Sequence, residues 1–156
     1  METAAEDLLY FVDVAVDGMV SIVEDLGDDL ANKAPGIPGA NSPFVILTHC
    51  IGVMAFWGTE VAAGQPVSRD RAAEFVATGR VTELAEKAKA AKAQLREVLV
   101  GLALGDDARI QPKRDFGPDR PRFKVATAIT HILEELAQHH GQMEISRDLL
   151  KAEAKA

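Results

Sequence analysis

The sequence predicts an all-α protein, a four-helix bundle with a long connection before its last helix. Alanine, valine and leucine are abundant and aromatic residues make up only 5% of the chain, a composition that suits helices better than sheets. Apolar residues recur at helical spacing over long stretches, and the glycines and prolines gather in a few loops between them. Because 156 residues is the size of one ordinary domain, we expect a single domain over residues 1–156.

The first helix is expected over residues 3–26. Leu8, Leu9 and Val12 begin a series of apolar residues at helical spacing, while acidic residues lie largely on the opposite face. Residues 28–41 then bring two prolines and two glycines close together, which predicts an extended loop. Since apolar residues occur on several faces of this helix, a homodimer is one expectation for the protein.

The second helix is expected to begin at Pro43 and to extend for about 22 residues. Ser42 suits the N-cap, and proline suits the first helical position. The helix is apolar on almost every side, which predicts a buried core helix. A membrane span is the alternative, but His49 and Glu60 interrupt the apolar run and nothing else in the chain pairs with it as a second span.

The next part of the chain predicts a short helix over residues 68–77 and a third long helix over residues 83–102. We expect Arg69, Arg71 and Arg80 to be solvated around the short helix. Thr82 is expected to cap the long one.

The chain then predicts a long connection over residues 103–119, which contains glycines and prolines. Long connections in compact domains are often functional. The last helix is expected from about residue 121 to about residue 151, and the tail from about residue 152 should fray.

Charge and cysteine content narrow the function. The net charge of −7 argues against a surface that neutralises phosphates, so we expect no nucleic-acid partner. With Cys50 as its single cysteine, the chain can form neither an intrachain disulfide nor a cysteine-based zinc cluster. The start METAAEDLLY lacks the features of a secretory signal. We therefore expect a cytoplasmic protein with a small-molecule substrate and no membrane partner.

Three of the four histidines lie in the stretch THILEELAQHHGQ, residues 130–142. Four-residue spacing puts His131, Glu135 and His139 along one side of a helix. On a helical wheel, His139 lies at the edge of the apolar stripe, Glu135 a step further out and His131 at the outer margin, while His140 points about 100° away from His139. The wheel favours Glu135 and His139 as ligands and puts His131 at a pocket rim or behind the ligands.

His49 is the fourth histidine, and its neighbours in the second helix are apolar. A buried imidazole has to satisfy its nitrogens. If the second helix packs on the last, His49, Glu135 and His139 could surround one divalent ion with positions open for water or substrate. Two other readings stay open: His49 is a hydrogen-bonded core residue, or the stripe with His131 is an exposed face whose i, i+4 pairs stabilise the helix.

Basic residues concentrate in ARIQPKRDFGPDRPRFK, residues 108–124, in a chain that is otherwise acidic. Arg114, Arg120 or Arg122 could recognise an anionic group on a substrate, with a solvated loop as the alternative. Cys50 is expected to be a small buried hydrophobe rather than a ligand or nucleophile.

The stretches PGANSPFVILTHCIGVMAFWG and DRPRFKVATAITHILEELAQHHGQMEISRDLL resemble the DinB/YfiT-like superfamily of bacterial four-helix-bundle metalloproteins. They are most similar to its actinobacterial branch, which is related to mycothiol-dependent enzymes. In that superfamily a histidine of the second helix joins a pair four residues apart on the last helix, and a short turn written H-x-G-Q follows the pair. The resemblance carries these roles onto His49, Glu135 and His139, with Gln142 at the end of the motif.

One position departs from the common pattern. Many members have histidine where this chain has Glu135, although the mycothiol-dependent maleylpyruvate isomerases resemble this chain in having glutamate. The resemblance implies one divalent metal, for which zinc is the first expectation and nickel or manganese are alternatives, since carboxylate is a competent ligand for all three.

The resemblance also implies a metal-dependent transferase that joins a low-molecular-weight thiol such as mycothiol to a small electrophile. A cation favours the thiolate, which is the nucleophilic form. For this activity, the arginine-containing loop before the last helix and the region of Arg69 could line the mouth of the cleft. Two other functions stay open, because one fold hosts many activities. They are a metal-dependent hydrolase of a small molecule and a non-catalytic, stress-related binding protein.

Overall fold

The computed structural model describes residues 3–112 and 122–156. These residues contain no β-strand, which confirms the predicted all-α class. In chain order the elements are α1 (Thr3–Ala31), α2 (Pro43–Met54), the π-helix η1 (Ala55–Ala62), α3 (Arg71–Glu74), α4 (Val81–Leu99) and α5 (Val125–Glu153).

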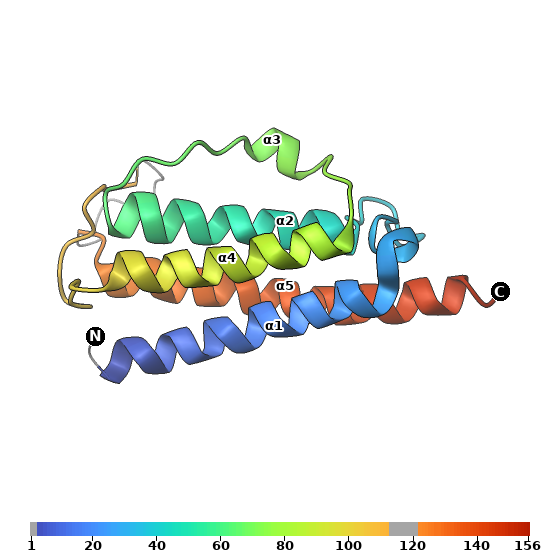
Figure 1. Ribbon diagram of the computed structural model, residues 1–156, viewed down its shortest axis with the longest axis horizontal. Coiled ribbons are helices and arrows are strands. Elements are labelled where there is room, and N and C mark those ends of the chain that lie inside the picture. The colour runs from blue at the N-terminus through green and yellow to red at the C-terminus, as the bar shows by residue number, and fades with distance from the viewer. Residues whose placement is uncertain (1–2, 113–121) are drawn as a thin grey trace.

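The long helices form a bundle in which α1 and α5 run in one direction while α2 and α4 run in the other (Figure 1). Two successive helices of the bundle, α2 and α4, are therefore parallel. Residues 63–80 make this possible because they return along the outer side of α2 and carry the short helix α3 (Figure 1). Of the helices around it, α2 packs against α4 and α5 in the bundle and against α3 on the outside.

The second predicted helix is present, but it changes type midway. Ser42 caps α2 as predicted, since its hydroxyl accepts a hydrogen bond from the backbone N–H of Val45 at 3.2 Å. The helix then continues as the π-helix η1, which the sequence did not predict. Such π-helical turns often occur at functional sites. Here they carry Trp57.

The same long segment, Pro43–Ala62, is sufficiently long and apolar to cross a membrane, the one such segment among the described residues. It is 61% buried inside the protein over its most apolar window. It packs against α4 and α5, which makes it a core helix of the bundle.

The start of α4 differs from the prediction. Arg80 occupies the N-cap position without a side-chain hydrogen bond, and Thr82 lies inside the helix. Instead, Asp28 accepts a hydrogen bond from the Val81 backbone N–H at 2.7 Å. Asp28 reaches α4 because α1 does not end at residue 26: Gly27 adopts a left-handed conformation with φ 66°, and another helical turn follows it. The predicted Thr82 cap is therefore wrong.

The connection between α4 and α5 is anchored on Phe123, which is buried. The Gln111 side chain holds its backbone, since Oε1 accepts from the Phe123 N–H at 2.8 Å and Nε2 donates to its carbonyl at 3.1 Å. The Phe123 ring stacks on Trp57 with 5.5 Å between centroids. The connection thus packs against η1 near its start.

Three helices are shorter than predicted at their starts or ends. α3 spans four residues rather than ten, α4 ends at Leu99, and α5 begins at Val125 rather than near residue 121. The bundle core is filled by large apolar side chains of the long helices, among them Leu9, Met19, Leu47, Leu95, Ile132, Leu136 and Met143.

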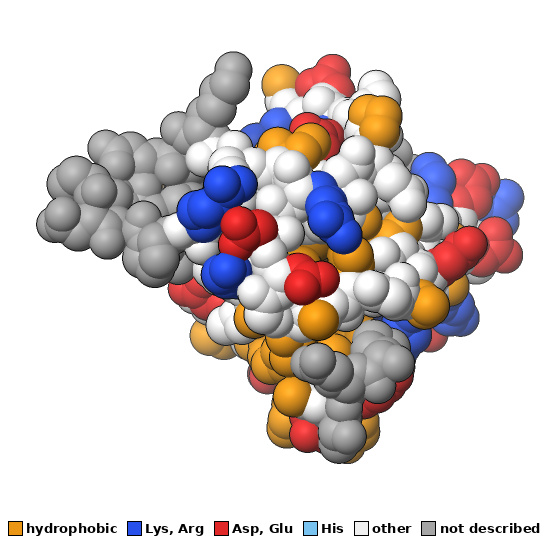
Figure 2. Space-filling view, turned by 90° about the vertical axis from the view of Figure 1, so that its left-hand side faces the viewer, with side chains coloured by type: hydrophobic (Ala, Val, Ile, Leu, Met, Phe, Trp, Pro, Cys, Tyr) orange, Lys and Arg blue, Asp and Glu red, His pale blue; other side chains and the backbone are white. Residues whose placement is uncertain are grey.

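At the end of the molecule shown in Figure 2, basic and acidic side chains lie next to one another.

Candidate metal centre

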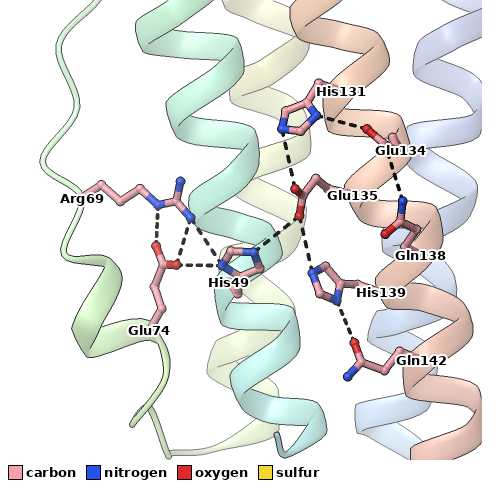
Figure 3. A network of polar contacts seen from close by, with 9 residues as sticks. All are labelled: His49, Arg69, Glu74, His131, Glu134, Glu135, Gln138, His139 and Gln142. Atoms are coloured by element: carbon pink, nitrogen blue, oxygen red, sulfur yellow. Dashed lines mark hydrogen bonds and ion pairs between the residues drawn. The ribbon is translucent and has the colours of Figure 1, made fainter. Parts of the chain in front are cut away.

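Three side chains predicted as ligands converge between α2 and α5. His49, Glu135 and His139 each offer one ligand atom, and these atoms lie within 4.8 Å of one another. Glu135 lies between the two imidazoles, as Figure 3 shows: its Oε2 is 3.7 Å from Nε2 of His49 and 3.6 Å from Nε2 of His139. Both separations are too long for hydrogen bonds. The structure thus brings together residues from two helices that the sequence could only pair by hypothesis.

The Nδ1 atoms of His49 and His139, which face away from Glu135, form hydrogen bonds with other side chains. Nδ1 of His49 donates to Glu74 Oε2 at 3.0 Å, and Nδ1 of His139 donates to Gln142 Oε1 at 2.9 Å. With the proton on Nδ1, each imidazole keeps a lone pair on Nε2. Proteins orient metal-binding histidines by such hydrogen bonds to the second nitrogen.

The donor set fits a divalent cation. Two imidazole nitrogens and a carboxylate oxygen are the ligands found in catalytic zinc sites, which leave further positions open. Ligand bonds of about 2.0–2.1 Å to a tetrahedral ion separate the ligand atoms by roughly 3.3 Å. The separations of 3.6 and 3.7 Å between the carboxylate oxygen and the two Nε2 atoms are close to that spacing.

His131 lies closer to the core than the helical wheel predicted. Its side chain is 16% exposed, compared with 26% for His139 and 30% for Glu135. The predicted order, with His131 outermost, is wrong because Trp57 of η1 covers this imidazole, with 4.6 Å between ring centroids. His131 Nδ1 donates to Glu134 at 3.2 Å, while its Nε2 is buried, has no hydrogen-bond partner among the described residues and lies 3.6 Å from Glu135 Oε1.

His140 points away from the centre, as predicted. Its imidazole packs on Gly18 of α1, where an added Cβ would lie 2.2 Å from Nε2 of His140. The short turn expected from the H-x-G-Q motif is absent, since α5 continues through Gly141 to Glu153. Because the helix is unbroken, Gln142 lies nearly one turn after His139, which explains its hydrogen bond to that imidazole.

Sequence reasoning missed Glu74 and predicted the wrong exposure for Arg69. Glu74 lies on the four-residue helix α3, too short for any periodic pattern, and its side chain is 8% exposed. Arg69 was expected to be solvated, but its side chain is 17% exposed and its Nε donates to Glu74 Oε1 at 2.6 Å. The prediction failed because a buried carboxylate draws the guanidinium inward.

The contacts around Glu74 keep it ionised. Burial alone would raise the pKa of the Glu74 carboxyl, but hydrogen bonds from Arg69 and His49 outweigh burial and lower this pKa below its ordinary value. Glu74 can therefore only accept hydrogen bonds at neutral pH.

A cavity of about 390 Å³ opens beside the proposed ligands. Its walls combine polar and apolar side chains. They are His49, His131, Glu135, Arg69 and Arg71, with Val53, Phe56, Trp57 and Pro112. Its volume suits a small molecule.

Of the three arginines predicted to contact an anion, the structure describes only Arg122. Arg114 and Arg120 lie outside the described residues. Arg122 has a side chain that is 70% exposed, and its Nε lies 2.9 Å from Asp107 Oδ2. Among the described residues, Arg69 and Arg71 of the segment before α4 line the cavity.

Cys50 follows His49 in α2 and is completely buried, as predicted. Burial raises the pKa of its thiol far above the ordinary value, and the carboxylates of Glu135 and Glu74 raise it further. Cys50 is therefore a core residue rather than a source of thiolate.

Comparison with known proteins agrees with this architecture. A family model described as mycothiol S-transferase matches residues 7–152. None of the curated proteins compared with the chain matches it. Among solved structures, the crystal structure of a conserved protein from Enterococcus faecalis is similar with a TM-score of 0.73 and 15% sequence identity, covering 97% of this chain and 99% of that one. At that identity the likeness concerns the fold alone.

Proposed function

Because this chain belongs to the mycothiol S-transferase family, a DinB-like family, we propose that it is a metal-dependent enzyme of the cytoplasm that joins a mycothiol-type thiol to a small electrophile. One observation carries the proposal. Two imidazole Nε2 atoms and a carboxylate oxygen converge within 4.8 Å beside a cavity of about 390 Å³.

In this proposal His49, Glu135 and His139 hold one divalent cation. Zinc is the first expectation, and nickel or manganese accept the same kinds of donor. When bound, the cation would favour the thiolate form of a thiol in the adjacent cavity. Glu74 and Gln142 contribute by orienting the two imidazoles.

The thiol has to come from outside the chain. Cys50, the single cysteine, has no exposed surface. The cavity offers an apolar wall of Val53, Phe56 and Trp57 across which the apolar part of an electrophile can pack. Burial of that part would also exclude water from the reacting sulfur.

The reaction balances without an oxidant or reductant. The thiolate sulfur forms a bond to an electrophilic carbon, and the leaving group, such as a halide, departs with the electron pair of the bond that breaks. The thiol proton is released to solvent. Holding the two reactants together in one cavity would accelerate this bimolecular step.

The test measures mycothiol binding and turnover in the zinc-loaded protein. We expect saturable binding of mycothiol that is lost on chelation, and a thioether product with an activated aryl halide that mass spectrometry detects. His139→Ala should abolish both. If the metal-loaded protein instead cleaves small esters at a rate independent of thiol, it is a hydrolase. If it binds neither metal nor thiol, the enzyme proposal fails.

A further inference from the structure

Glu74 is a buried carboxylate outside the proposed ligand set, and both of its oxygens accept hydrogen bonds. Its Oε2 accepts from His49 Nδ1 at 3.0 Å. Arg69 donates to both of its oxygens, from Nε at 2.6 Å and from Nη2 at 2.9 Å (Figure 3). Removing a charged group from water is costly unless it is paired in this way. The ion pair of Glu74 with Arg69 therefore stabilises the carboxylate in its buried position.

The backbone of α2 is shaped to receive this pair. Gly52 lies one helical turn after His49, and a Cβ added to it would lie 2.1 Å from Glu74 Oε1 and 2.9 Å from Arg69 Nε. Any larger residue would therefore push the carboxylate and the guanidinium away from α2. The return segment that carries α3 runs along the outer side of α2 (Figure 1), and α3 packs against α2.

The geometry selects one tautomer of His49. An ionised carboxylate can only accept a hydrogen bond, so the His49 nitrogen facing Glu74 has to carry the proton. Arg69 Nη2 also lies 3.4 Å from this nitrogen. That contact does not replace the hydrogen bond from His49 to Glu74, because Nη2 donates to Glu74 Oε2 at a shorter distance. Nη2 and Nδ1 lie close together because both donate to this same oxygen. The opposite nitrogen, Nε2, then has a free lone pair.

We propose that Glu74, held by Arg69 and accommodated by Gly52, is a positioning residue that keeps the His49 proton on Nδ1 and directs an unprotonated Nε2 toward Glu135 and His139. Its effect on metal affinity rests on the proposed function. Its effect on the tautomer does not, because it concerns the metal-free protein.

The first experiment reads the tautomer directly. Nitrogen-15 NMR of the metal-free protein, at a pH at which the imidazole is neutral, distinguishes a protonated ring nitrogen from an unprotonated one. We expect a protonated Nδ1 in the wild-type protein. In Glu74→Gln the amide N–H can donate to Nδ1, so the proton should shift in part or wholly to Nε2.

The second experiment measures zinc dissociation constants by competition with a chelating dye. Glu74→Gln should weaken zinc binding about 10- to 100-fold, the usual effect of losing a hydrogen bond to a metal-binding histidine. Gly52→Ala should weaken it as well, although Glu74 itself is unchanged and alanine favours a helix more than glycine does.

Glu60→Gln is the matched control. Glu60 is a partly buried carboxylate of η1 that binds the return segment, since it accepts from the Val67 N–H at 3.3 Å. We expect it to change neither the tautomer nor zinc affinity.

A His49 proton on Nε2 in the neutral wild-type ring would overturn the proposal, as would a Glu74→Gln variant with unchanged tautomer and unchanged zinc affinity. If the wild-type protein binds no zinc, the proposed function fails. In that case the tautomer measurement alone still decides the role of Glu74.

Discussion

Nε2 of His49 lies 3.7 Å from Oε2 of Glu135, although the two residues belong to different helices of the bundle. The distance is too long for a hydrogen bond, and Nε2 of His139 lies at a similar 3.6 Å from the same oxygen. With the proton on Nδ1, His49 keeps a lone pair on Nε2, the nitrogen that faces this carboxylate. A cation bound between these atoms would satisfy all three groups together.

Alanine substitutions should separate the ligands from their neighbours. His49→Ala, Glu135→Ala and His139→Ala should each weaken zinc binding by at least about 100-fold, because each removes one of three ligands and the loss of a mere orienting group already costs 10- to 100-fold. His140→Ala should leave zinc affinity unchanged, since this imidazole packs on Gly18 of α1. Equal losses in all four variants, measured by competition titration, would contradict the assignment.

Gln142 should tune the centre through His139. Its Oε1 accepts from His139 Nδ1 at 2.9 Å on the exposed side of α5. Because that hydrogen bond is open to water, Gln142→Ala should weaken zinc binding near the lower end of the usual range, about 10-fold. Gln138→Ala is the control, because Gln138 bonds Glu134 rather than a proposed ligand. A loss of equal size in both variants would exclude this role for Gln142.

The cap of α4 gives a stability prediction. Asp28→Ala should lower the free energy of unfolding by about 0.5–2 kcal/mol, the usual cost of losing a helix cap, because Asp28 accepts from the Val81 N–H at 2.7 Å. Thr82→Ala should have an effect within about 0.5 kcal/mol, as surface changes usually do. Denaturant unfolding measures both. A larger loss in the Thr82 variant would restore the cap predicted from the sequence.

Trp57, which lines the cavity, should contribute strongly to the stability of the fold. It is buried, stacks on Phe123 and covers the edge of His131. Trp57→Ala should lower the free energy of unfolding by about 3–5 kcal/mol, as deletions of buried aromatic side chains do. Val76→Ala, at a side chain that is 77% exposed, should change it by less than about 0.5 kcal/mol. Similar midpoints for the two variants in urea would mean that Trp57 is not packed as described.

Much of the architecture follows from local sequence signals. Ser42 and Pro43 mark the start of α2 because capping and the fixed proline φ act over a few residues. The four-residue spacing of Glu135 and His139 puts both on one side of α5, because residues i and i+4 of a helix lie on the same face. His49 stood out because an imidazole among apolar neighbours requires a partner.

What could not be predicted depends on contacts between distant segments. Glu74 meets His49 only because the return segment runs along α2 and packs α3 against it, and a four-residue helix has no periodicity to reveal its orientation. A helical wheel predicts His131 at the margin because it does not include Trp57, which reaches this imidazole from η1. Asp28 caps α4 from the far end of α1, a contact that no local pattern around Thr82 could indicate.

The metal content of the protein tests the central claim most directly. Elemental analysis of protein purified without an affinity tag should find about one divalent ion per chain, and adding zinc or nickel to chelator-treated protein should raise its melting temperature, because a ligand bound only by the folded state stabilises it. His139→Ala should show neither effect. A wild-type protein with no stoichiometric metal and no rise in melting temperature would contradict the account.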